Sequence, residues 1–220
     1  MSDAVFISGV SGYLGHALVP LLRRHGIEVR GVVRPGSRVP QGCHAVQGDA
    51  LQSATFAQTV KGCGTLVHLT GARHPAPWKR DQFEAIDWVS LRASLQAAVN
   101  GGVSHFVYVS VAQPAPVMND YIAVRQRCET AIRESGISST VLRPWYVLGP
   151  GHRWPVVLRP LYSLLEAAPP TRKGALRLGL VTLAEMASAL EQSVLNPATD
   201  IRIVDVPSIR ELAKQQRSQF

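Results

Sequence analysis

The hydrophobic positions near the start of the chain follow two different periods. Residues 4–8 form a short apolar run of strand-favouring residues, and Leu14, Leu18, Leu21 and Leu22 then recur at helical spacing. Three glycines, at positions 9, 12 and 15, stand between the two patterns. The sequence therefore predicts a strand, a glycine turn and a helix, with an irregularity at Pro20, which lacks the amide proton that the helix needs.

The same alternation continues to about residue 142. Further strands are predicted at 28–33, 44–47, 65–69, 105–110 and 139–142, and helices near 55–60, 82–99 and 120–135. Glycines at 101, 102 and 136 are placed to end helices. The buried side of the 82–99 helix is expected to hold Ile86, Val89, Leu91, Leu95 and Val99. Strands that alternate with helices predict an α/β fold, a Rossmann-type doubly wound parallel sheet.

The alternation breaks down after Pro144. Residues 149–180 are rich in proline and glycine, which favours loops, with one helix expected at 158–168. A helix at 183–195 and a late strand at 201–206 are expected to rejoin the main sheet. At 220 residues the chain is predicted to form a single domain, residues 1–220.

Composition points to an ordered protein of the cytoplasm. Hydrophobic residues make up 46% of the chain and charged residues 17%. The start of the chain has no basic segment, and its first apolar run is too short for a signal peptide or a membrane span. Cys43, Cys63 and Cys128 share no metal-type spacing, so we expect free thiols and no metal site.

The net charge of +8 does not by itself indicate nucleic-acid binding. The arginines are spread along the chain, the longest basic run is Arg23-Arg24, and no nucleic-acid-binding motif accompanies them. Steering of an anionic cofactor or substrate, or an ordinary basic surface, is the better explanation of such a charge. We therefore expect a small-molecule partner and no nucleic acid. A homodimer stays open, because helical faces do not show whether they pack within one chain or between two.

The glycine turn suits the pyrophosphate of a dinucleotide. Gly9 permits a tight turn, Gly12 lets a phosphate approach the backbone, and Gly15 allows the helix to pack closely on the strand. Free amides and the helix dipole would then face the anion. An ordinary turn between a strand and a helix is the alternative.

The spacing Gly-x-x-Gly-x-x-Gly resembles that of the extended and atypical short-chain dehydrogenase/reductase family. Similar segments continue at 48–49, 66–72, 106–110, 142–144 and 180–187, so the resemblance covers nearly the whole chain. It implies a small substrate lobe at 145–180 and an acidic residue, Asp49, beside the adenine. Asp49 could instead cap the helix that follows. The remaining cofactor contacts that the resemblance implies are Ser11, Tyr13, Leu14, Ala50, Leu69, Thr70, Gly71, Ala72, Pro144 and Val147.

The choice of cofactor depends on the end of the second predicted strand. NAD sites usually carry an acidic residue there, and this chain has Arg34, nineteen positions after Gly15, with Arg38 close behind. A pair of guanidinium groups would bind a 2′-phosphate, so we expect NADP(H), with NAD as the alternative. Arg34 and Arg38 could also be solvated loop residues.

Reductases of this family use a Tyr-x-x-x-Lys pair, in which the cation lowers the pKa of the phenol and also reaches the ribose. Here the pair is Tyr121 and Arg125, and the hydroxyl partner is Ser110, although the extended enzymes often place that hydroxyl one position later, at Val111. Residues i and i+4 share one helical face, so the cation can still tune the phenol. The exchange of lysine for arginine leaves two hypotheses open.

The first hypothesis is an NADP(H)-dependent oxidoreductase or epimerase-like enzyme that acts on a small carbonyl or hydroxyl compound. The second is a silent NADP(H) sensor that resembles nitrogen-metabolite-repression regulators. An RNA-associated member of the family is a third and weaker possibility. His68 is expected in the core, whereas His74, His152 and the aromatic and basic residues at 145–154 could face a substrate.

Overall fold

The computed structural model describes residues 4–115, 117–149 and 178–217, and a seven-stranded sheet organises this part of the chain. Its strands are β1 (Ala4–Ser8), β2 (Glu28–Val33), β3 (Cys43–Gln47), β4 (Thr65–His68), β5 (His105–Val109), β6 (Ser138–Leu142) and β9 (Ile201–Val204). They lie in the order β3-β2-β1-β4-β5-β6-β9, and every pair is parallel. The doubly wound parallel sheet predicted from the sequence is confirmed.

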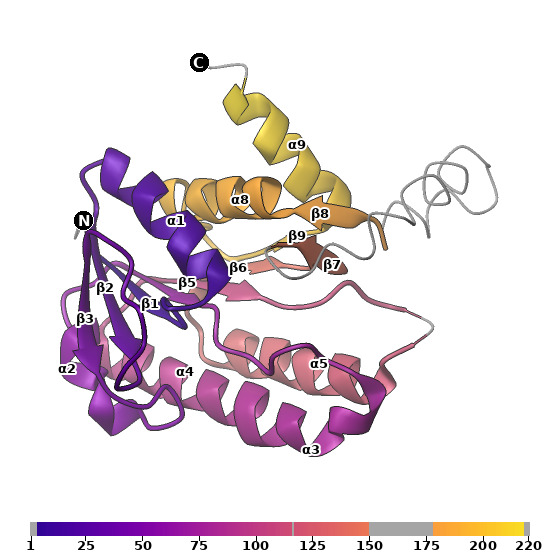
Figure 1. Ribbon diagram of the computed structural model, residues 1–220, viewed down its shortest axis with the longest axis horizontal. Helices are drawn as coiled ribbons and strands as arrows, with labels where there is room; N and C mark the ends of the chain where they lie inside the picture. Colours follow the sequence, from indigo (N-terminus) through magenta and orange to yellow (C-terminus); the bar gives the residue numbers. More distant parts are fainter. Residues whose placement is uncertain (1–3, 116, 150–177, 218–220) are drawn as a thin grey trace.

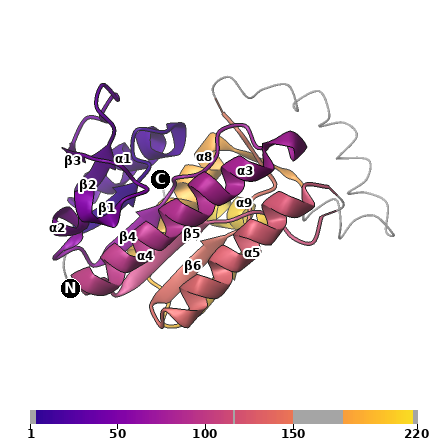
Figure 2. The same ribbon diagram turned by 90° about the horizontal axis from the view of Figure 1, so that it is seen from below.

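Helices cover both faces of the sheet (Figure 1). One face carries α1 (Tyr13–Arg24), α8 (Leu183–Leu195) and α9 (Val206–Arg217), and the other carries α2 (Ala57–Val60), α3 (Arg80–Gln82), α4 (Val89–Gly101) and α5 (Asn119–Glu134). Figure 2, which views this second face, shows α4 and α5 side by side in front of the sheet. Each face has its own apolar cluster, so the strands are buried on both sides, as a parallel sheet requires.

The strand order reverses at β1, which pairs with β2 on one side and with β4 on the other. The connections that leave the carboxyl ends of β1 and β4 therefore run to opposite faces of the sheet. In open α/β sheets such a switch point leaves a crevice beside the strand ends, which is where ligands bind. The fold directs the glycine turn and the connection after β4 to this position.

The prediction for the buried side of the 82–99 helix is wrong in part. Val89 and Val99 are 38% and 54% exposed, whereas Asp87, Ser90 and Ser94 are buried. A π-helical turn, Phe83–Trp88, precedes α4 and inserts an extra residue into the helical repeat. Polar side chains can occupy this buried face because they bond across it: His68 Nδ1 lies 2.9 Å from Ser94 Oγ. The prediction that His68 belongs to the core is confirmed.

The end of the chain also differs from the sequence prediction. The strand expected at 201–206 ends at Val204, and α9, which the pattern did not predict, begins at Val206. A second sheet pairs β7 (Tyr146–Leu148) with β8 (Leu180–Thr182) in parallel. The helix expected at 158–168 lies outside the described residues.

Local signals explain how several helices begin and end. Thr182 accepts a hydrogen bond from the amide of Glu185 (3.2 Å), whose carboxylate accepts from the amide of Thr182 (2.8 Å) at the start of α8. Gly102 ends α4 with a φ of +70°, as expected. Helix α1 runs through the exposed Pro20 without a break, although Pro20 has no amide proton to donate to the carbonyl of His16.

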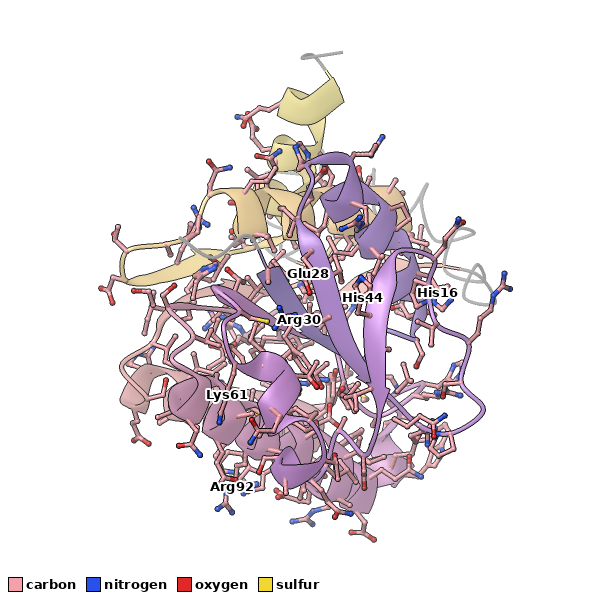
Figure 3. The ribbon with its side chains drawn as sticks, turned by 90° about the vertical axis from the view of Figure 1, so that its left-hand side faces the viewer. His16, Glu28, Arg30, His44, Lys61 and Arg92 are labelled. Atoms are coloured by element: carbon pink, nitrogen blue, oxygen red, sulfur yellow. The ribbon has the colours of Figure 1, made fainter. Side chains whose placement is uncertain are left out.

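Strand β3 forms one edge of the sheet, and Figure 3 shows the charged residues beside it. Arg30 on β2 pairs with Glu28 at 2.7 Å and donates to the carbonyl of Lys61 at 3.0 Å. The guanidinium group of Arg30 is therefore already bonded to neighbouring groups of the protein.

Candidate dinucleotide site

The glycine turn has the backbone geometry that the sequence predicts. Gly9 has a φ of +83°, and a Cβ there would lie 2.8 Å from the amide nitrogen of Thr70. A Cβ at Gly15 would lie 2.1 Å from the carbonyl oxygen of Val10, so only glycine lets α1 pack this closely on the turn. The tight turn and the close packing are confirmed, and contact with a cofactor stays a prediction.

Gly12 lies at the amino end of α1, where a phosphate would approach. It is the N-cap residue, it makes no side-chain capping bond, and the first turn holds no acidic side chain. A Cβ at Gly12 would meet only the carbonyl oxygen of Gly9 within 4 Å, at 3.2 Å. No capping side chain thus competes for the amides of this turn, which fits the pyrophosphate of a dinucleotide.

The connection after β4 lies against the glycine turn. The amide of Leu69 donates to the carbonyl of Ser8 at 2.8 Å, and the hydroxyls of Ser8 and Thr70 are 2.8 Å apart. The buried Ala72 donates its amide to Asp87 at 3.1 Å. The segment 69–72, which the family resemblance assigns to the cofactor, is therefore fixed by bonds at both ends.

The end of β2 presents two exposed arginines. The amide of Ser37 donates to the carbonyl of Arg34 at 3.0 Å, which closes a turn through Pro35 and Gly36. Gly36 has a φ of +75°, as the third residue of a type II turn requires. Arg34 and Arg38 are exposed on either side of this turn, and no carboxylate among the described residues pairs with either of them.

Asp49 caps the turn that follows β3. Its carboxylate accepts from the amide of Leu51 at 3.0 Å and from the side-chain amide of Gln52 at 3.2 Å. These bonds close a local turn, whereas the helices that follow begin at other N-cap residues, Gln52 and Phe56, so the alternative that Asp49 caps the following helix is wrong. Contact of Asp49 and the partly buried Ala50 with an adenine stays a prediction.

Tyr121 and Arg125 share one face of α5, as their spacing predicts. The guanidinium carbon of Arg125 lies 4.9 Å from the ring centre of Tyr121, and the ring of Phe83 packs against the same phenol at 4.9 Å. Burial raises the pKa of Tyr121, and the cation of Arg125 opposes this effect. The phenol and the cation are in contact, which is the arrangement that proton transfer by Tyr121 would need.

Arg125 is buried, and several of its N–H groups donate hydrogen bonds within the protein. Its guanidinium forms an ion pair with Asp87 and donates to the hydroxyl of Tyr108 (3.1 Å) and to the carbonyl of Val109 (2.8 Å). Its Nε has no partner among the described residues. Burial acts to lower the pKa of Arg125, but Tyr108, Tyr121 and Asp87 outweigh it, and that pKa stands well above its ordinary value.

Ser110 is bound to a carboxylate that the sequence analysis did not single out. Its hydroxyl donates to Glu129 at 2.5 Å, and the side-chain amide of Gln113 donates to the same oxygen at 2.8 Å. Arg143 completes the network with an ion pair to Glu129. This network ties the end of β5 to the end of β6. The catalytic role expected for Ser110 stays a prediction.

Asp87 and Glu129 are the residues that sequence reasoning missed. Both carboxylates are buried, at 1% and 6% exposure. Each forms its ion pair with an arginine far away in the sequence, Arg125 and Arg143 respectively. The sequence signal that could have found them is an acidic residue within the buried face of a helix, because a buried carboxylate needs a partner.

Tyr13, at the start of α1, lies close to the residues in and just after β7. A Cβ at Gly149 would lie 3.1 Å from the ring of Tyr13. Burial raises the pKa of Tyr13, and the nearby phenols of Tyr121 and Tyr146 raise it further. The carbonyl of Pro144 accepts from the amide of Ala112 at 2.9 Å, and Val147 packs on the core.

Three of the predicted substrate-facing residues, His152, Arg153 and Trp154, lie outside the described residues. Ser11 lies on the glycine turn, and Leu14 lies in the first turn of α1.

None of the helices in the described part of the chain combines the length and the apolar character needed to cross a membrane.

Comparison with known proteins gives the family independently of this geometry. Residues 9–157 match the sequence profile of a family described as NAD(P)H-binding. The chain is 30% identical over 112 residues to short-chain dehydrogenase/reductase family 42E member 1 of Xenopus laevis, which covers 49% of this chain and 29% of that protein. It is 27% identical over 151 residues to the ceramide reductase of Caulobacter vibrioides, which covers 67% of this chain and 47% of that protein.

A third relative is named for a different role. Photosystem II assembly factor Ycf39 of Trieres chinensis is 26% identical over 145 residues, which covers 64% of this chain and 44% of that protein. The matched segments span less than half the length of each of these relatives.

Solved structures share the fold at low sequence identity. MoeE5 in complex with UDP-glucuronic acid and NAD superposes with a TM-score of 0.71 at 18% identity, covering 98% of this chain and 82% of that one. UDP-glucuronic acid 4-epimerase of Bacillus cereus, solved with NAD, gives a TM-score of 0.66 at 14% identity, covering 92% of this chain and 77% of that one. Likeness at this level of identity concerns the fold alone.

Proposed function

Because the chain belongs to the NAD(P)H-binding family, we propose that it binds NADP(H) at the glycine turn and acts on a small carbonyl or hydroxyl compound. The reaction would be that of an oxidoreductase or an epimerase-like enzyme. The observation that carries the proposal is the contact of Tyr121 with the buried cation of Arg125. The ceramide reductase relative supports this class of chemistry.

In the reductive direction, a dinucleotide held by the glycine turn would supply the hydride that a carbonyl carbon accepts. Tyr121 donates its phenolic proton to the carbonyl oxygen, the product is the alcohol, and the phenolate regains a proton from solvent. Arg125 favours the phenolate because its positive charge lies against the phenol ring. The low exposure of Arg125 strengthens this effect, because little water lies between the cation and the ring.

We propose NADP(H) over NAD(H) from the end of β2. Arg34 and Arg38 stand where NAD-binding proteins usually hold a ribose carboxylate. Charge-assisted bonds to a 2′-phosphate would favour NADPH, whereas the free diol of NADH would find no acceptor there. The exposed positions of both arginines on the Pro35-Gly36 turn leave their side chains free to close on that phosphate.

A cofactor titration tests this proposal. Binding of NADPH and NADH is followed by cofactor fluorescence in wild type, Arg34→Ala and Arg133→Ala. The last variant removes an arginine that is also exposed but lies at the far end of α5. We expect NADPH to bind more tightly, with the preference lost in Arg34→Ala and kept in Arg133→Ala. Equal affinities in the wild type would refute the NADP(H) assignment.

A sensor that binds NADP(H) without turnover is the second candidate function. It is favoured by the donors of Arg125, which bond Asp87, Tyr108 and Val109, and by Ser110, which bonds Glu129. The relative named as an assembly factor also fits a role without catalysis. Consumption of NADPH with a broad panel of carbonyl compounds separates the two functions: an enzyme loses this activity in Tyr121→Phe, and a sensor shows none in either protein.

A further inference from the structure

Asp87 is a fully buried carboxylate at the junction of three segments of the candidate site. Its side chain has no exposed surface. One oxygen pairs with Arg125 on α5, and the other accepts from the amide of Ala72 in the connection after β4. Asp87 itself lies in the π-helical turn Phe83–Trp88. Turns of this kind inside helices are often found at functional sites.

Gly71 provides the space for this ion pair. A Cβ at Gly71 would lie 2.7 Å from Nη2 of Arg125 and 3.0 Å from Oδ1 of Asp87. Either distance is too short for a side chain at this position without displacement of the pair. The connection after β4, the π-helical turn and α5 therefore fit together around one guanidinium group.

These contacts hold the guanidinium group of Arg125 against the ring of Tyr121. Its remaining bonds, to Tyr108 and Val109, hold it to β5. We propose that Asp87 is a positioning residue, which holds Arg125 against Tyr121 and moderates how strongly that cation favours the phenolate. This inference assumes the proposed role of Tyr121 as proton donor, and it adds a residue that controls that role.

The direction of the effect follows from the charges around Tyr121. Arg125 and Cys128 face it from α5, Asp87 from the π-helical turn, and Tyr13 from the start of α1, while Tyr108 on β5 shares the cation. After burial, Arg125 is the largest influence on the pKa of Tyr121 and lowers it, whereas Asp87 raises it. Removal of the charge of Asp87 should therefore lower the pKa of Tyr121.

The test measures this pKa directly by NMR of protein labelled with ¹³C at the tyrosine Cζ. The Tyr121 signal is identified by its loss in Tyr121→Phe. Asp87→Asn keeps the size and one acceptor oxygen, which can stay with Arg125 while the amide of Ala72 loses its acceptor. We expect its Tyr121 to titrate about one pH unit below wild type. Asp81→Asn, which removes an exposed charge from α3, is the control and should leave the titration unchanged.

An unchanged or higher titration midpoint in Asp87→Asn, or an equal fall in Asp81→Asn, would overturn the inference. If Asp87→Asn does not fold, the double variant Asp87→Asn/Arg125→Gln leaves no buried charge unpaired. Its Tyr121 should titrate above wild type, because the cation in contact with the ring is gone, and a midpoint equal to wild type would also overturn the inference. The measurement needs no substrate, so the two failures can be told apart: an unshifted Tyr121 titration counts against the role of Asp87, and absence of turnover counts against the proposed enzyme function.

Discussion

Removal of the cation from the buried Asp87–Arg125 pair should destabilise the protein strongly and in a pH-dependent way. In Arg125→Met, an apolar chain of similar length replaces the guanidinium group. Asp87 would then be a buried carboxylate whose ion-pair partner is gone, since Arg125 is its counter-ion in the part of the chain that the structure describes. Tyr108 and Val109 would lose a donor in the same substitution.

The magnitude follows from the burial of both partners. Their side chains are 7% and 0% exposed, so the pair is not screened by water. Loss of one partner from a buried ion pair costs about 3–5 kcal/mol. For a protein of this length, each kcal/mol lowers the melting temperature by roughly 2–4 °C, so we expect a fall on the order of 10 °C.

The pH dependence has a definite sign. Burial already raises the pKa of Asp87, and loss of Arg125 removes an influence that lowers it. An acid whose pKa is higher in the folded state stabilises the fold while protonated, and this contribution is lost as pH rises through the folded pKa. The loss of unfolding free energy in Arg125→Met should therefore be smaller near pH 5 than near pH 8.

Urea denaturation at the two pH values gives the free energies of unfolding. Arg125→Lys is the matched control, because it keeps a positive charge opposite Asp87 and should lose less stability with less pH dependence. The double variant Arg125→Met/Asp87→Leu should recover much of the loss, since no unpaired charge remains. A deficit of less than about 1 kcal/mol that is equal at both pH values would refute the reasoning, because it would mean that Asp87 has another counter-ion or access to water.

Three further outcomes are expected. Gly12→Val should fold but lose thermal stabilisation by NADPH, because the branched side chain would occupy the approach to the turn amides; stabilisation equal to wild type would contradict the proposed phosphate site. Tyr121→Phe should reduce any turnover roughly a hundred- to ten-thousand-fold with nearly unchanged NADPH affinity, and full activity would exclude the proton-transfer role. Glu129→Gln should lower the free energy of unfolding in urea by about 2 kcal/mol, because Arg143 loses its ion pair, and an unaltered stability would show that this network contributes little.

The sequence predicted the fold well where neighbouring residues carry the information. The glycine turn is such a case, since the φ of Gly9 and the close packing at Gly15 follow from the absence of side chains there. The capping pair of Thr182 and Glu185 likewise marks the start of α8 within one turn of helix. Apolar runs similarly placed the strands of the main sheet to within a few residues, because a strand buried on both faces has to be apolar.

Prediction from local sequence patterns failed where an element depends on contacts with residues far away in the sequence. The helical pattern of 82–99 assigned Val89 and Val99 to the core, because it assumed an uninterrupted helix with an apolar buried face. The π-helical turn and the polar contacts of the buried face break both assumptions. Helix α9, which begins at Val206, was missed because the valines and isoleucines at 201–206 are compatible with one continuous strand.

The sequence by itself therefore determined the class of fold, the glycine turn and the shared face of Tyr121 and Arg125, all of which depend on residues within a few positions of one another. Only the tertiary structure decided which groups hold that cation. Asp87 lies thirty-eight positions before Arg125, and Glu129 lies fourteen before Arg143. Buried charges need partners wherever the fold brings them, and no sequence spacing specifies which acid will meet which base.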